Sequence, residues 1–480
     1  MKKNYKRCYY PIAVGLLLFS IFCIRYRTLA LSAHPTGLDG YYYALQAKSF
    51  AQTGKLENPD TAPGYYLCGL FAFVSRDAII GCKVYSALAS TLIALSVFTL
   101  LCSLCPTQRK KPLLGLLLCA AIPSSVQLSV NYINNQTGLY FFLFYASLII
   151  HLLHARHQRR PTLFALAAVL LILSLLSHLI TATYSLFFTA CIAYRALPKK
   201  ITLPLMVGIV LSMLYVAARH YPRFAGIFSW TPTIPATSSF MRSRLDWRLI
   251  AELSLLPILC WAACIYTTIV KKRFIPYIGA AFLLYFPFWG MNSLDMGYRL
   301  FLSASPCAIV LLVHLLHNPR NRLTSLTPTY TGALLMCVAG IVTSSSIYDP
   351  QNDPPYEYYR TVANKIDIGD DSLLIAHLGM NHVYTYYQNL RMALNYVPDF
   401  PFRKEKLWRL AYGVQSTTVQ HLFPEMDTFE FASLVQPIDR KYLLIREDLW
   451  NEYLRREQPD IRETRRNWYN PATPRPKFIR

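Results

Sequence analysis

The long N-terminal part of this sequence has very few acidic residues. Only seven acids precede Tyr348, whereas the whole 480-residue chain has 25 acids and 48 Lys and Arg residues. They are Asp39, Glu57, Asp60, Asp77, Asp246, Glu252 and Asp295. Transporters place ionisable residues within their spans and often show two repeated halves. Here acids in the middle of a span are essentially absent, since only Glu252 falls within an apolar run and it lies near the start of that run. No internal repeat is visible either, and both observations argue against a transport pathway.

Other signatures are missing as well. Neither GxGxxG nor GxxxxGK[ST] occurs, which excludes the usual phosphate-binding loops of nucleotide enzymes. All 12 cysteines precede Val338, so the C-terminal part carries no disulfide. The pair Cys102 and Cys105 has no second pair at metal spacing, which argues against a zinc site.

What the sequence does contain is a series of apolar runs. Between residues 11 and 348 they recur at lengths of roughly 17–25 residues, each long enough to cross the hydrocarbon core. We expect about eleven spans, at 11–27, 79–104, 112–130, 138–154, 162–177, 180–197, 201–219, 248–270, 274–290, 300–317 and 329–348. The run from 162 to 197 is too long for one span, so a tight turn is predicted at His178.

The positive charge is distributed as a topology signal. The net charge of +23 could suggest nucleic-acid binding, but the basic clusters fall in short turns between alternate apolar segments. The positive-inside rule then puts the N-terminus in the cytoplasm and, with an odd number of spans, the C-terminal part on the other side. We therefore expect no nucleic-acid partner, and contacts with membrane lipids instead.

The chain is expected to divide into a polytopic helical membrane domain at 1–348 and a small soluble α/β domain at 349–480. Outer-face loops are predicted at 28–78, 221–247 and 291–299, and the first should contain two short helices at 38–53 and 64–74. In the soluble domain, helices are predicted at 356–366, 382–388 and 448–456, and strands at 372–376, 392–396 and 442–446.

Asp39 is the acid that most needs an explanation. It lies in Gly37-Leu38-Asp39-Gly40-Tyr41-Tyr42-Tyr43, just beyond the first apolar segment. Because it precedes a helix-like run, its carboxylate could cap the free amides of that helix. A carboxylate at the outer mouth of a helical bundle could equally take part in a reaction. The residues alone leave both interpretations open.

Several segments resemble GT-C glycosyltransferases, in particular the lipid A aminoarabinose transferases and the protein O-mannosyltransferases. Residues 38–49, closed by Gly54, resemble the first outer loop of that superfamily. Residues 63–99 resemble its proline-rich juxtamembrane helix and second span, and Gly297-Tyr298-Arg299-Leu300 with Pro306 is similar to the entry of a late span. Residues 356–366 and 384–396 resemble the start of its periplasmic C-terminal domain.

The sequence departs from this pattern in two places. Many GT-C enzymes carry a second acid in the next outer loop, where this chain has Asn131-Tyr132-Ile133-Asn134-Asn135-Gln136. A lysine that is common near the outer end of a later span is replaced by His178. The missing acid weakens the case for a two-carboxylate metal site, so a divalent metal is possible but not required.

The resemblance implies transfer of a sugar from a polyprenyl phosphate donor to a lipid, glycan or protein acceptor. The reaction would take place at the outer face of a bacterial inner membrane, where the C-terminal domain would be periplasmic. Asp39 would be the catalytic carboxylate. Cationic and aromatic candidates for donor binding are Arg299, His178, Arg242, Arg244 and Tyr42. Each has a plainer alternative: snorkelling for Arg299, a hydrogen-bonded interfacial residue for His178, solvated loop charges for Arg242 and Arg244, and an interfacial-belt position for Tyr42.

Three other interpretations remain open. One is a transporter of lipid-linked glycans, which the scarcity of mid-span acids argues against. A second is a glycan polymerase of the outer face, although that class usually places its large loop between spans. A third is a GT-C-like protein that binds its ligand without turnover, an alternative that the missing second acid keeps open.

The predicted topology can be tested with reporter fusions. Fusions after Lys111, Arg160, Lys200 and Lys272 should report a cytoplasmic position, because the basic turns stay on that side. A fusion after Asp349 should report a periplasmic one. A cytoplasmic signal at Asp349 would mean that the number of spans is wrong by one, and chemistry at the outer face would lose its basis.

Overall fold

The computed structural model describes most of the chain. The described residues are 2–37, 39–108, 110–154, 161–196, 246–271, 294–315, 345–377, 379–389 and 406–457, with isolated positions at 204, 208, 337, 339–343, 391, 393 and 394. Of the expected spans, 274–290, nearly all of 201–219 and half of 329–348 lie outside this part.

Internal contacts divide the chain into two compact units. The first contains residues 1–33, 60–67 and 83–352, and the second contains 34–59, 68–82 and 353–480. The second unit thus joins two segments of the first outer loop to the C-terminal residues. The expected division of the chain into a membrane domain at 1–348 and a soluble domain at 349–480 stays a prediction.

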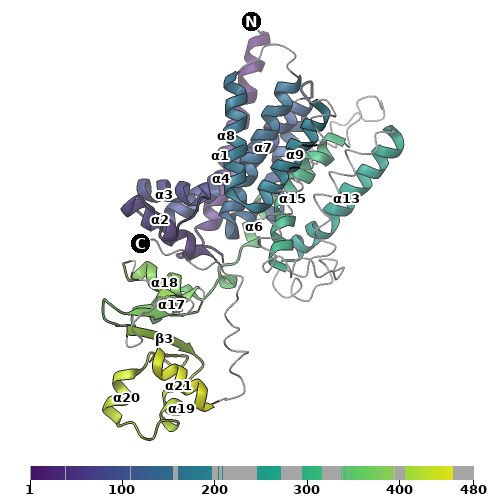
Figure 1. The fold of residues 1–480 in the computed structure, drawn as a ribbon. Coiled ribbons are helices and arrows are strands. Elements are labelled where there is room, and N and C mark those ends of the chain that lie inside the picture. Colours follow the sequence, from purple (N-terminus) through teal and green to yellow (C-terminus); the bar gives the residue numbers. More distant parts are fainter. Residues whose placement is uncertain are drawn as a thin grey trace. The chain divides into compact units, whose positions relative to one another are not determined.

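The first unit is helical. Its helices are α1 (Lys2–Leu29), most of α4 (Ala78–Leu104), α5 (Lys110–Ala121), α6 (Pro123–Asn131), α7 (Ile133–His154), α8 (Pro161–Ser177), α9 (Leu179–Ala196), α13 (Trp247–Lys271) and α15 (Leu294–Leu315). Figure 1 shows α7, α8 and α9 packed against one another in this unit. Within the described residues, five helices are long and apolar enough to cross a membrane, or six if α5 and α6 form one span. The protein is therefore a multi-pass membrane protein.

The expected span at 112–130 is broken. Helices α5 and α6 meet at an angle of 57° instead of forming one straight helix. Proline at the first position of α6 has no amide to donate and forces the preceding residue out of the helical region. Ile122 accordingly has an extended backbone, with φ −72° and ψ 140°. Averaged hydropathy across 112–130 could not show this break.

The turn predicted at His178 is confirmed. Helix α8 ends at Ser177 and α9 begins at Leu179. The Nδ1 atom of His178 accepts a hydrogen bond from the amide of Ile180 at 3.2 Å, which satisfies one of the free amides at the start of α9. Two short apolar helices thus replace one run that is too long to be a single span.

The second unit contains the helices of the first outer loop and the C-terminal domain. Helix α2 (Gly40–Thr53) ends at Gly54, whose positive φ of 73° closes it, and α3 (Pro63–Ser75) follows with its later part in this unit. Both helices were predicted. The C-terminal helices are α17 (Tyr356–Ala363), α18 (Met380–Tyr387), α19 (Ser416–His421), α20 (Thr428–Leu434) and α21 (Glu447–Glu457).

A mixed five-stranded sheet organises the C-terminal residues. The strands are β1 (Leu373–Ile375), β2 (Ala393–Leu394), β3 (Leu407–Tyr412), β4 (Val435–Pro437) and β5 (Tyr442–Arg446), in the order β2-β1-β3-β5-β4. Strands β2, β1 and β3 are parallel, and β5 and β4 complete the sheet in antiparallel fashion. One core lies with α17 and α18, and the other lies with α19, α20 and α21 on the opposite side of β3 (Figure 1).

The expectation of a small α/β domain is consistent with this sheet, but four of its elements were not foreseen. These are β3, β4, α19 and α20. The central strand β3 contains Arg409, which forms a bidentate ion pair with Glu447 at 2.6 and 2.8 Å. The Glu447 side chain is only 3% exposed. A charge in a central strand is stable only with such a partner, and the partner is 38 residues away.

The packing around the turn at His178 can be tested at Gly138 in α7. A Cβ at Gly138 would overlap Thr181 Oγ1 and the Cβ of Ser177, on the two helices that flank His178. Gly138→Ala should therefore destabilise the protein by about 1–3 kcal/mol, the usual cost of overpacking. Gly15→Ala is the matched control, because nothing lies within 4 Å of the added methyl group. Thermal unfolding in detergent measures both, and equal melting temperatures would contradict this packing.

Candidate functional site

Asp39 occupies the N-cap position of α2 but does not cap the helix. Its backbone carbonyl accepts the first helical bond, from the amide of Tyr43 at 3.1 Å. Its side chain makes no capping hydrogen bond to the α2 amides. The backbone at Asp39 has φ −97° and ψ 15°, and the side chain is half-buried. The geometry thus favours the second of the two interpretations that the sequence left open, although a role in reaction stays a prediction.

The segment before Asp39 is held by the residues around the start of α17. The amide of Gly37 donates to Asp353 Oδ1 at 3.0 Å, and the Tyr356 hydroxyl donates to the Gly37 carbonyl at 2.5 Å. Gly37 has a positive φ of 79°, a conformation that suits glycine. Burial raises the pKa of Tyr356, and the negative charges of Asp353 and Asp39 raise it further. Asp39 therefore lies in the electrostatic neighbourhood of a hydroxyl that stays protonated.

A tyrosine cluster joins α2 to α18 in the same unit. Tyr41 is 1% exposed, and its hydroxyl lies 2.7 Å from the Tyr387 hydroxyl and 2.9 Å from Nδ1 of His34. His34 Nε2 lies 2.9 Å from Glu357 Oε2. His34 thus bridges Tyr41 and Glu357. The position of Asp39 is set by tertiary contacts with the C-terminal residues and not only by the local helix.

Tyr42 has a packing partner in the same unit. Its ring lies 5.1 Å from the ring of His382 in α18. Burial lowers the pKa of His382 to about 4, so the imidazole is neutral at physiological pH. The contact gives His382 a packing role against α2. A contact of Tyr42 with a sugar stays a prediction.

In the first unit, Arg299 packs on an aromatic ring. It lies in the second turn of α15, half-buried, with its guanidinium carbon 4.6 Å from the centre of the Tyr132 ring. Tyr132 is the residue between α6 and α7, in the segment where the GT-C resemblance led us to look for a second acid. A cation–π contact orients a guanidinium without removing its charge. This arrangement could present Arg299 to an anion, as phosphate binding would require.

The structure says less about the remaining cationic candidates, which are His178, Arg242 and Arg244. His178 lies at the break between α8 and α9, where its Nδ1 accepts from Ile180, so the structure gives it a local hydrogen-bonding role. Arg242 and Arg244 lie outside the described residues. Substrate contacts by all three stay predictions.

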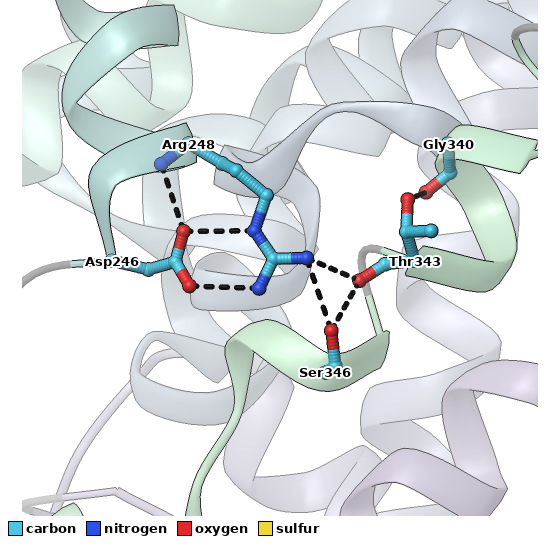
Figure 2. A network of polar contacts seen from close by, with 5 residues as sticks. All are labelled: Asp246, Arg248, Gly340, Thr343 and Ser346. Carbon is cyan, nitrogen blue, oxygen red and sulfur yellow. Dashed lines mark hydrogen bonds and ion pairs between the residues drawn. The ribbon is translucent and has the colours of Figure 1, made fainter.

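Asp246 is engaged in an ion pair. Arg248 donates to its carboxylate through Nε at 2.9 Å and Nη2 at 2.7 Å, and reaches the Thr343 carbonyl and the Ser346 hydroxyl through Nη1 (Figure 2). The hydrogen bonds from Arg248 hold the pKa of Asp246 below its ordinary value. Asp246 thus stays ionised within a network that fixes the start of α13, which makes it a weaker candidate for a general base than Asp39.

No metal cluster is evident in the part of the chain that the structure describes. There, no group of three or more His, Cys, Asp or Glu side chains is arranged to hold an ion. A site built from the residues around Asp39 or Tyr132 would therefore need further ligands, and we assign no residue to a metal.

Several charged side chains inside the first unit were not assigned a role from the sequence. Lys83 in α4 is 7% exposed and donates to the Ser32 carbonyl at 2.5 Å. Arg25 in α1 is 1% exposed, and the half-buried Glu252 in α13 accepts from Ser124. The sequence signal that could have pointed to them is a charged residue within an apolar run, because a charge inside the membrane is costly unless it has a partner or a function.

Comparison with known proteins identifies the fold. No protein-family model and no curated protein matches the sequence. Two solved structures of ArnT from Cupriavidus metallidurans are similar over 91% of this chain and 97% of theirs. The apo structure has a TM-score of 0.51 at 12% identity, and the structure bound to undecaprenyl phosphate has 0.52 at 11%. The chain has an ArnT-like fold.

The ArnT-like fold agrees with what the resemblance implied about architecture, namely a multi-pass helical membrane protein with a small C-terminal α/β domain. At 11–12% identity the likeness shows the fold and not the reaction. The roles of individual residues therefore rest on the geometry described above.

Proposed function

We propose that this protein is a glycosyltransferase that moves a sugar from a polyprenyl phosphate carrier to a lipid, glycan or protein acceptor. The reaction is placed at the outer face of a bacterial inner membrane, with the N-terminus in the cytoplasm and the C-terminal domain in the periplasm. The observation that carries this proposal is the likeness, over nearly the whole chain, to an ArnT structure bound to undecaprenyl phosphate.

Asp39 is the proposed general base. In the transfer, an acceptor hydroxyl oxygen forms a bond to the anomeric carbon while the bond from that carbon to the carrier phosphate breaks. The phosphate leaves with the bonding electrons, and a carboxylate takes the proton of the hydroxyl. Three observations support Asp39: it does not cap α2, its loop is fixed through Gly37, and it belongs to a part of the chain with few acids.

Arg299 is the proposed contact for the carrier phosphate. The leaving phosphate gains negative charge in the transition state, and a guanidinium can bind two of its oxygens at once. Stacking on Tyr132 restrains the side chain without removing its charge. His178, Arg242, Arg244 and Tyr42 remain secondary candidates for donor or sugar contacts.

A protein that binds the carrier without turnover is the second candidate. Tyr132 and its neighbours contain no acid where the GT-C resemblance led us to look for one. Such a protein would bind a polyprenyl phosphate but transfer nothing, so measurements of binding and of transfer separate the two candidates.

Substitution of Arg299 tests the phosphate contact. Arg299→Ala should weaken binding of undecaprenyl phosphate roughly ten- to a hundredfold, the range for loss of charge-assisted hydrogen bonds. Arg299→Lys should also be impaired, because a point charge cannot reproduce the guanidinium fork or its stacking. Both variants should remain monodisperse in detergent. Normal binding and turnover in Arg299→Ala would return this residue to a snorkelling role.

Substitution of Asp39 tests the catalytic role. Asp39→Asn keeps nearly the same shape and a capping oxygen, so sugar transfer should fall roughly a hundredfold or more only if the carboxylate is the base. Asp39→Ser, which also keeps a capping oxygen, should lose activity to a similar extent. Asp77→Asn is the matched control, since Asp77 does cap its helix, accepting from the Ile80 amide at 2.9 Å. It should transfer sugar normally.

The measurement is sugar transfer to the native acceptor by folded, monodisperse protein. If both Asp39 variants fold and transfer sugar at the wild-type rate, Asp39 is not the base. The acid would then have to be sought at Asp60, Asp246 or Asp295.

A further inference from the structure

The break between α5 and α6 leaves backbone groups without partners in their own helices. The N-cap residue of α6 is Ile122, whose side chain cannot accept a hydrogen bond, and Pro123 follows it. The amides of the first turn of α6 and the last carbonyls of α5 therefore need acceptors and donors from elsewhere. In a membrane-embedded unit, each unsatisfied backbone group costs several kcal/mol.

Two charged side chains from other helices supply these partners. Glu252 of α13 accepts from the Ser124 amide at 2.8 Å and from the Ser124 hydroxyl at 2.6 Å. Arg25 of α1 donates to the Ala120 carbonyl at 2.5 Å. The signs match the helix dipoles, with the anion at the N-terminus of α6 and the cation at the C-terminus of α5. This match explains why these two charges are retained inside the bundle.

Helix α6 also packs against α15, the helix that carries Arg299, and α13, which carries Glu252, contacts both. Tyr132 follows Ser124 by eight residues, just past the end of α6. At 1.5 Å per residue this separation is about 12 Å. Helix α6 is thus held to α13 by Glu252 at its start, and the Arg299–Tyr132 contact links its other end to α15.

We infer that Glu252 and Arg25 are positioning residues that hold the broken helix so that Tyr132 seats the Arg299 guanidinium. Neither needs to touch the substrate. Their effect passes through the placement of α6, a helix of only nine residues whose two ends are Pro123 and Asn131. The consequence for phosphate binding rests on the proposed function, whereas the consequence for α6 does not.

The first test is hydrogen exchange by mass spectrometry on the full-length protein in detergent. Glu252→Leu removes both acceptors, so peptides covering 123–136 should exchange faster, whereas peptides from α20 should be unchanged. Glu252→Gln can still accept from the Ser124 amide and donate to its hydroxyl, and it should restore slow exchange. Wild-type exchange in Glu252→Leu, or equally fast exchange in both variants, would overturn the inference whether or not the protein binds lipid.

The second test separates positioning from loss of folded protein. Turnover is measured with a lipid-linked sugar as the donor. Glu252→Leu and Arg25→Met should each raise KM for the donor roughly tenfold or more, because a misplaced Arg299 would lose its charge-assisted contact with the phosphate. The change in kcat should be smaller. Loss of folded protein would instead lower the apparent kcat at constant KM. Ser124→Ala, which removes only the 2.6 Å bond and is the mildest change, should raise KM less.

Arg27→Ala is the matched control. Arg27 lies two residues after Arg25 on α1 but is exposed, so KM should stay at the wild-type value. Unchanged KM in folded Glu252→Leu, Arg25→Met and Ser124→Ala would overturn the inference. If the wild type itself binds no polyprenyl phosphate, the proposed function fails, and the exchange measurement alone decides the role of Glu252 and Arg25.

Discussion

Backbone hydrogen bonding inside the hydrocarbon core is the constraint on which the first unit depends. It requires helices through the membrane and partners for every group that a helix break releases. The chain satisfies these groups in two ways. His178 accepts a hydrogen bond from an amide at the start of the helix that follows it, α9, whereas Glu252 of α13 accepts one from an amide at the start of α6. Two of the charges inside the first unit, Arg25 and Glu252, therefore lie together at the break that Pro123 creates.

The same reasoning applies to the Asp39 segment, where the partners come from the far end of the sequence. Gly37 is held by Asp353 and Tyr356, more than 300 residues later, and α2 contributes Tyr41 to the core beneath α17 and α18. The C-terminal domain is thus part of what fixes the acid-bearing loop. A GT-C-like enzyme that uses Asp39 would need this domain for the geometry of its base, even if the domain itself contacts no substrate.

The sequence predicts well those features that are decided locally. Apolar runs and Gly54 located α2, α3 and the five described helices that are long enough to span a membrane, and the excess length of the run from 162 to 197 located the turn at His178. It fails where partners far along the chain decide. Strand β3 can carry Arg409 because Glu447 is buried beside it, and the break that Pro123 creates is stabilised by Glu252, which accepts from the Ser124 amide. For the candidate site, the sequence singled out Asp39 and Arg299 by position. Only the structure shows that Asp39 does not cap α2 and that Arg299 stacks on Tyr132.

The central claim is that this chain uses a polyprenyl phosphate sugar as its donor. The most direct measurement is mass spectrometry of the lipids that co-purify with the full-length protein from its native membrane, combined with a binding assay for added undecaprenyl phosphate. The account predicts an enriched polyprenyl phosphate carrying a sugar, and saturable binding that competes with it. A protein that brings no such lipid with it and does not bind undecaprenyl phosphate would contradict the account.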